Sequence, residues 1–126
     1  MSPLVYYWQK VNLQSYATFR GRASRPEYWW ALLANLIIYF ALFWVQIILI
    51  FVAPSGIVAS LSYLYSLAFL VPGLAVGVRR LHDTGRSGWW LLIGLIPAIG
   101  WIVLIVLFTV EGQANSNRYG DVPARL

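Results

Sequence analysis

The residues with the clearest chemical potential lie in one short stretch, RRLHDTGRSGWW, at positions 79–90. It contains His82, the only histidine of the chain, next to Asp83. Histidine is a common acid–base group near neutral pH, so the pair suggests an enzyme acting on a phosphorylated or lipidic substrate. Adjacent residues on a helix point about 100° apart, however. We therefore favour His82 as a hydrogen-bonding residue and Asp83 as the partner of an arginine, and assign no residue as catalytic.

A second polar stretch, FRGRASRPEYWW, occupies positions 19–30. Ser24 and Glu27 have the spacing of a capping box at the start of a helix, and Pro26 suits its first turn. The two stretches together suggest one composite polar cluster. It would bind an anionic headgroup or phosphate, or lock neighbouring helices together. Its members are Arg22, Arg25, Glu27, Arg80, His82, Asp83 and Arg86.

Metal and cofactor chemistry has little support in the sequence. One histidine and no cysteine leave no ordinary zinc site within a single chain. We expect neither a metal nor a cofactor.

The composition is that of a membrane protein. Hydrophobic residues make up 60% of the 126 residues and charged residues 10%, against roughly 45–50% and 25% in soluble domains. Nine Lys and Arg against four Asp and Glu give a formal charge of +5. Because the basic residues flank apolar runs, they indicate orientation in the bilayer and contact with anionic lipid headgroups, not nucleic acid.

The hydropathy pattern predicts an all-α integral membrane protein with one domain, residues 1–126. Three uncharged runs, 28–52, 57–78 and 89–110, are each about as long as the roughly 20 residues that span a bilayer. The link 53–56 is so short that the first two spans must form an antiparallel hairpin. Gly94, Pro97 and Gly100 leave an alternative for the third run, a re-entrant loop that would return the C-terminus to its starting side.

The ends of the chain flank this membrane domain. Residues 1–27 form an N-terminal segment in which the aromatic-rich stretch 3–19 predicts a short interfacial helix, with a loosely held arm as the alternative. Residues 111–126 form a short polar tail. We expect no cleaved signal peptide, since the first run is too long for one.

The distribution of basic residues predicts the orientation. Seven of the nine precede the first or third span, and only Arg118 and Arg125 follow the third. Because Lys and Arg concentrate on the cytoplasmic side, the N-terminus is expected inside and the C-terminus outside.

Polar and small residues inside the spans predict helix packing. Asn35 and Gln46 share one helical face of the first span, and an unpaired amide in lipid is costly. Gly73 and Gly77 form a Gly-x-x-x-Gly spacing that allows close helix approach. A polar path or ligand cavity is the alternative interpretation.

Three motifs resemble a known family. They are F-x-G-R-x-x-R-x-E-Y-W at 19–29, R-R-L-H-D-x-G-R-S-G-W-W at 79–90, and N-R-Y-G at 117–120. They are similar to those of a family of small bacterial inner-membrane proteins known as domain of unknown function 805. The resemblance implies an inner-membrane location and brings no established activity.

Three classes of function follow from these patterns. The leading one is a non-enzymatic interaction, scaffold or regulatory protein. Its basic collar, the Lys and Arg residues that precede the first and third runs, contacts anionic headgroups of the bilayer. Its protein partner is a second copy or another membrane protein. The alternatives are the interfacial enzyme described above and an oligomeric channel or transporter. The spans contain no charged residue or histidine, which disfavours ion-coupled transport.

Overall fold

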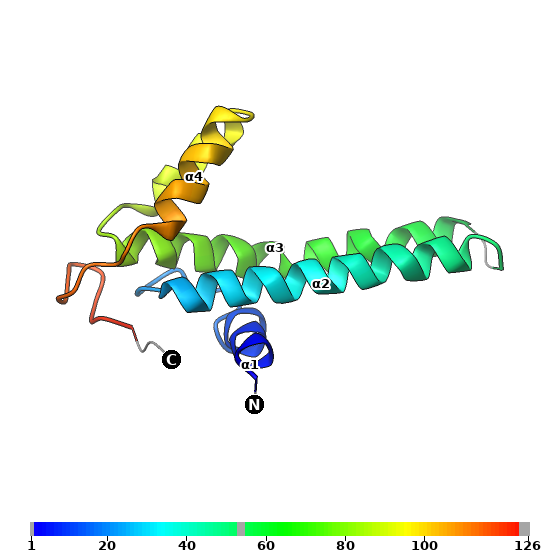
Figure 1. The fold of residues 1–126 in the computed structure, drawn as a ribbon, viewed down its shortest axis with the longest axis horizontal. Helices are drawn as coiled ribbons and strands as arrows, with labels where there is room; N and C mark the ends of the chain where they lie inside the picture. The colour runs from blue at the N-terminus through cyan, green and yellow to red at the C-terminus, as the bar shows by residue number, and fades with distance from the viewer. Residues whose placement is uncertain (1, 53–54, 124–126) are drawn as a thin grey trace.

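A computed structural model describes residues 2–52 and 55–123, apart from the side chains of residues 55, 58 and 59. In this part of the chain the regular elements are all helical. Two long antiparallel helices form a hairpin, with the other elements gathered toward one end of it (Figure 1). In chain order the elements are α1 (Pro3–Gln9), the π-helix η1 (Lys10–Gln14), α2 (Arg25–Leu49), α3 (Ser55–Asp83), the 3₁₀-helix η2 (Gly88–Leu95) and α4 (Ile99–Thr109).

The α2–α3 hairpin confirms the first two predicted helices and shifts their bounds. The Ser24 hydroxyl accepts a hydrogen bond from the Glu27 amide at 3.3 Å and so caps α2, as the sequence predicts. At 1.5 Å per residue, the 25 residues of α2 extend about 37 Å, more than the roughly 30 Å of a hydrocarbon core. Among the described residues, Arg25–Leu49 and Ser60–Asp83 are long and apolar enough to cross a membrane.

Amide and hydroxyl groups join α2 to α3 along the hairpin. The Asn35 side-chain oxygen accepts from the Tyr65 hydroxyl at 2.7 Å and from the Trp8 indole at 3.0 Å. Nearer the loop, the Gln46 amide donates to the Ser62 hydroxyl at 2.5 Å. Both amides therefore face protein, which avoids the cost of leaving an amide unpaired in lipid.

The predicted straight helix over 89–110 is wrong. Residues Gly88–Leu95 form the 3₁₀-helix, the chain reverses, and Ile99–Thr109 return as α4. At the reversal Ala98 has φ +64° and ψ −66°, and the Ile99 amide donates to the Pro97 carbonyl at 2.7 Å. This is the rare γ-turn with positive φ. Eleven residues of α4 extend only about 16 Å, too short to cross a bilayer.

Gly100 allows the two arms of this re-entrant hairpin to meet. A Cβ atom at this position would overlap the backbone carbonyl of Ile93 in η2. The Trp101 indole also donates to the Gly94 carbonyl at 2.9 Å, across the turn. The run 89–110 thus folds back on itself, as the re-entrant alternative requires, and Figure 1 shows η2 and α4 standing off the side of α3.

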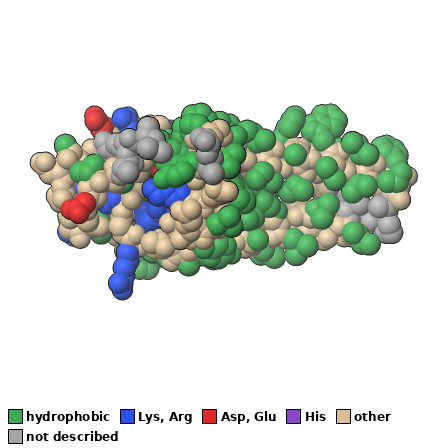
Figure 2. Space-filling view, turned by 90° about the horizontal axis from the view of Figure 1, so that it is seen from below, with side chains coloured by type: hydrophobic (Ala, Val, Ile, Leu, Met, Phe, Trp, Pro, Cys, Tyr) green, Lys and Arg blue, Asp and Glu red, His purple; other side chains and the backbone are tan. Residues whose placement is uncertain are grey.

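The reversal also corrects the predicted position of the C-terminal tail. The Arg22 guanidinium donates to the carbonyls of Gln113 and Asn115 at 2.6 and 2.9 Å. The described part of the tail thus lies at the same end of the hairpin as residues 19–30, not at the opposite end. On the face seen in Figure 2 the charged side chains gather at one end, while hydrophobic ones are spread along the rest.

The N-terminal segment is helical and packed against the hairpin. Figure 1 looks nearly along the axis of α1, so α1 crosses α2 and α3 instead of running beside them. Tyr7 and Val11 are buried, and Val11 packs with Ala31 of α2 and Val76 of α3. This segment is therefore not a loosely held arm.

Candidate functional site

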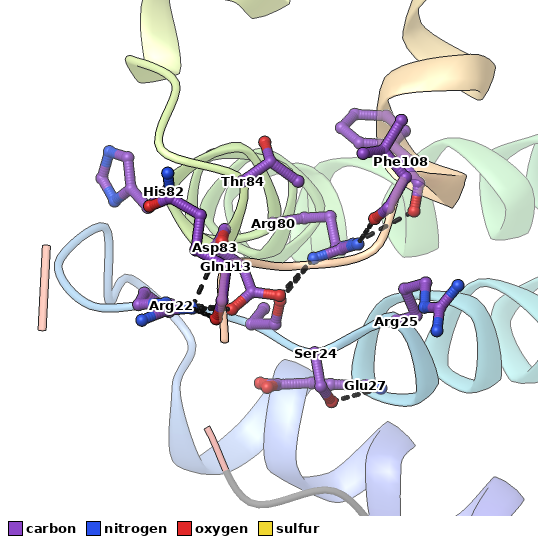
Figure 3. A network of polar contacts seen from close by, with 12 residues as sticks. Arg22, Ser24, Arg25, Glu27, Arg80, His82, Asp83, Thr84, Phe108 and Gln113 are labelled. Atoms are coloured by element: carbon purple, nitrogen blue, oxygen red, sulfur yellow. Dashed lines mark hydrogen bonds and ion pairs between the residues drawn. The ribbon is translucent and has the colours of Figure 1, made fainter. Parts of the chain in front are cut away.

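The polar stretches 19–30 and 79–90 meet at the charged end of the hairpin, beside Gln113 of the tail (Figure 3). The tail motif 117–120 lies there too, since Tyr119 stacks on His82. The end of α3, the start of α2 and the tail after α4 supply the side chains. Because α3 continues as a helix to Asp83, its last five residues include Arg79, Arg80, His82 and Asp83, which point at different neighbours.

Asp83 lies between two arginines. Its carboxylate pairs with Arg22 at 2.9 Å and with Arg80 at 2.6 Å, and all three side chains are fully buried. These three residues are called the Asp83 cluster below. Arg22 lies in the segment that leads into α2, so the cluster joins this segment to α3.

The guanidinium groups of the Asp83 cluster also bind backbone carbonyls. Arg22 donates to Gln113 and Asn115 in the tail, and to Gly120 at 3.3 Å. The cluster's other arginine, Arg80, donates to Ala23 and Phe108 at 3.1 Å each and to Val110. The rigid fork of an arginine presents five N–H donors. The two side chains therefore hold four separate segments together by charge-assisted hydrogen bonds.

His82 is also held by structural contacts. Its Nδ1 atom is 2.9 Å from the Gly21 carbonyl, and its ring stacks on Tyr119 with centroids 3.9 Å apart and planes 2° from parallel. The Asn117 side chain donates to the His82 carbonyl at 2.9 Å. The N-R-Y-G motif of the tail thus docks on the H-D pair of α3.

Glu27 belongs to a neighbouring buried pair. Its carboxylate lies 2.5 Å from Arg79 and 3.6 Å from Lys10 of η1. Through these two ion pairs Glu27 joins the N-terminal segment to both helices of the hairpin. The interior around it is polar: within the described part of the chain, buried side-chain atoms of Tyr7, Asn12 and Arg79 have no hydrogen-bond partner.

Two predicted cluster members lie outside this network. Arg25 has an exposed side chain, and its hydrogen bond to the Thr109 carbonyl is long, 3.4 Å. Arg86 is half-buried, and its backbone amide donates to the Leu81 carbonyl at 2.9 Å, but its side chain makes no ion pair or hydrogen bond in the described structure. Of the seven predicted residues, the structure thus brings Arg22, Arg80 and Asp83 into direct contact, with the others around them.

The two glycines of the Gly-x-x-x-Gly spacing differ in their surroundings. A Cβ at Gly77 would lie 3.3 Å from Leu91, so this glycine allows η2 to approach α3. A Cβ at Gly73 would meet nothing within 4 Å. Gly73 is therefore exposed on the surface, whereas Gly77 is buried in a helix contact.

Several contributors to the site were missed by sequence reasoning. Lys10 and Arg79 were interpreted as orienting charges, and Gln113, Asn117 and Tyr119 were placed on the opposite side of the membrane. The motif N-R-Y-G was the available signal for the tail. Among the described residues, no three His, Asp or Glu side chains gather closely enough to hold a metal ion.

This fold and site define a class, a helical protein with a long apolar hairpin whose charged residues are collected at one end. The model of the family described as protein of unknown function (DUF805) matches residues 16–121, and the chain belongs to that family. Inner membrane protein YhaI of Escherichia coli K12 is 47% identical over 116 residues, covering 92% of this chain and 94% of the relative. Inner membrane protein YhaH of the same organism is 41% identical, covering 92% and 95%. No solved structure matches the chain.

Proposed function

We propose that the protein is a non-enzymatic scaffold or regulatory protein of the inner membrane, with both ends in the cytoplasm. The buried Asp83 cluster carries this proposal. Its arginines are engaged with a carboxylate and with main-chain carbonyls, which is the arrangement of a structural joint. The basic residues Arg25 and Arg86 around it remain available to anionic headgroups.

The interfacial-enzyme alternative has less support. It needs His82 and Asp83 to face a substrate. His82 is stacked on Tyr119, and Asp83 is fully buried between two arginines. A general base must lie within hydrogen-bond reach of the substrate proton, and the Nδ1 atom of His82 and the carboxylate of Asp83 are both already engaged within the protein.

The position of the charges supports the orientation. If only α2 and α3 cross the membrane, all nine Lys and Arg of the sequence fall on the side of residues 1–27 and 111–126, and the link 53–56 carries none. Such an imbalance favours a cytoplasmic position for the charged end. This assigns the C-terminus to the inside, unlike the three-span prediction.

Reporter fusions test the orientation. Green fluorescent protein after Leu126 should fluoresce and alkaline phosphatase there should be inactive, whereas alkaline phosphatase inserted in the link 53–56 should be active. The opposite result at Leu126 would restore a third crossing. The insertion in the link is the matched control for export of the reporter.

The scaffold role is tested in cells that lack the chromosomal gene. Crosslinking in intact membranes, followed by purification in mild detergent, should recover a second copy or another membrane protein. His82→Asn retains a nitrogen near the position of Nδ1 but removes the imidazole. We expect this variant to crosslink to the same partner as wild type and to restore the phenotype of the cells that lack the gene equally well. Loss of the phenotype at normal protein level and normal stability would favour the enzyme.

A further inference from the structure

A surface groove follows one face of α2 at the charged end of the hairpin. It encloses about 410 Å³ and is lined by Arg25, Pro26, Trp29, Trp30 and Leu33. Positions 25, 29 and 33 recur every fourth residue, so they lie above one another along the helix. From Arg25 to Leu33 the groove extends about 12 Å along the axis.

The lining changes from charged to apolar in the direction of the membrane. Arg25 lies at the first turn of α2, two tryptophans follow, and Leu33 faces the apolar part of the hairpin. This order matches a phospholipid seen from headgroup to tail. Tryptophan is enriched at the level where the glycerol and ester groups lie.

Arg25 and Trp30 keep N–H donors without an acceptor in the described part of the groove, whereas the Trp29 indole is engaged. The long 3.4 Å bond from Arg25 to Thr109 uses one of its guanidinium nitrogens. The Trp29 indole donates to the Phe108 carbonyl at 3.2 Å, which fixes this ring against the end of α4. The Trp30 side chain is 38% exposed, and its indole N–H has no acceptor among the described residues.

The charge of the groove is positive. Glu27, the acidic residue of the same helical turn, is buried on another side of α2 against Arg79 and Lys10. No acidic side chain belongs to the described lining. An occupant that places a negative charge at Arg25 is therefore complementary.

We propose that this groove is a binding site for one anionic phospholipid. The phosphate contacts the Arg25 guanidinium, the glycerol and ester region lies beside the Trp30 indole, and an acyl chain follows Leu33. The inference deepens the proposed headgroup contact of the basic collar and rests on it. An acyl chain is required because half of the site is apolar and open to lipid.

The test compares two lipids on the purified full-length protein. Native mass spectrometry in mild detergent gives the apparent affinities of dioleoyl phosphatidylglycerol and dioleoyl phosphatidylcholine. Wild type should prefer phosphatidylglycerol. Arg25→Gln should weaken that lipid about fivefold, the factor expected for one basic residue at a membrane surface, and Arg25→Lys should retain most of the preference.

Arg20→Gln is the charge-matched control, because Arg20 is an exposed arginine of the same stretch that does not line the groove. It should bind as wild type does. Equal losses for Arg20→Gln and Arg25→Gln would mean that overall charge attracts the lipid, and would overturn the site. An unchanged Arg25→Gln variant would overturn it as well.

A soluble competitor separates a lipid from a free phosphate. Glycerol phosphate at the concentration of the lipid should not displace phosphatidylglycerol, since it has no acyl chain; displacement would overturn the lipid assignment. Absence of any lipid preference in wild type would overturn this inference and the headgroup contact together. The reporter fusions and crosslinking decide the scaffold and its orientation independently of lipid.

Discussion

Asp83 balances the charge of two buried arginines, so replacing it with asparagine tests whether the cluster holds the fold together. Asparagine keeps the shape of the side chain and removes its charge. Arg22 and Arg80 would then lie in the protein interior without their shared counter-ion. Breaking one partner out of a buried ion pair costs about 3–5 kcal/mol. We expect Asp83→Asn to lower the free energy of unfolding by at least about 3 kcal/mol.

The assay is reversible unfolding of the purified protein in mixed micelles by increasing the fraction of sodium dodecyl sulfate. Asp121→Asn is the control, because this carboxylate belongs to an exposed residue and accepts from the Ser116 hydroxyl. Exposed substitutions of this kind change stability by no more than about 0.5 kcal/mol. The two variants remove the same charge, so their difference isolates the effect of burial.

A double-mutant cycle locates the interaction. Arg22→Gln, Asp83→Asn and the combined variant should show a coupling free energy between about 1 and 3 kcal/mol, as residues in one ion network do. The double variant should lose less stability than the sum of the two single variants, because once Asp83 has lost its charge, losing Arg22 removes a buried cation that has no counter-ion. A stability of Asp83→Asn within about 0.5 kcal/mol of wild type would refute the reasoning.

Two further predictions concern the re-entrant hairpin and the Glu27 pair. Gly100→Ala should force η2 and α4 apart, since the added Cβ would overlap the Ile93 carbonyl. Disulfide crosslinking between cysteines placed on the two arms should therefore fall sharply. Gly73→Ala is the control, because its Cβ meets nothing within 4 Å, and it should leave the crosslink intact. Glu27→Gln should destabilise the protein by about 3 kcal/mol in the same unfolding assay, because Arg79 loses its buried counter-ion. Combining it with Arg79→Gln should recover part of that loss, and a strictly additive pair would contradict the proposed contact.

The hairpin could be predicted from the sequence because its signals are local. Two uncharged runs joined by four residues leave only an antiparallel arrangement, and Ser24 and Glu27 mark the start of α2 at the observed position. The end of α3 was placed five residues too early, at Val78. Charged residues ended the apolar run there, whereas the helix itself continues to Asp83.

The third run was harder because its hydropathy is the same whether it crosses the membrane or turns back. Glycine and proline occur in membrane helices without ending them, so Pro97 and Gly100 were not decisive. The reversal depends on a positive φ at Ala98 and on a close approach of Gly100 to Ile93. Neither is a property of residue type alone.

Part of the composition of the polar cluster was predictable, but its partners were less so. The sequence identified an arginine as the partner of Asp83, and the observed partners are Arg22 and Arg80. It could not separate buried arginines from exposed ones, because that distinction depends on the return of the tail. Once Gln113 and Asn115 lie beside Arg22, its guanidinium has carbonyl acceptors and no longer faces water.

The location of the charged cluster explains how so apolar a chain adopts one arrangement. In lipid, helices gain little from hiding apolar surface, so packing and hydrogen bonds decide their contacts. The middle of α2 exposes large side chains such as Phe40 and Phe43, which would be equally well solvated by lipid in many arrangements. The Asp83 cluster instead binds carbonyl groups at fixed places on four segments. It therefore fixes the charged end of the molecule, while large apolar side chains of α2 and α3 remain exposed along the hairpin.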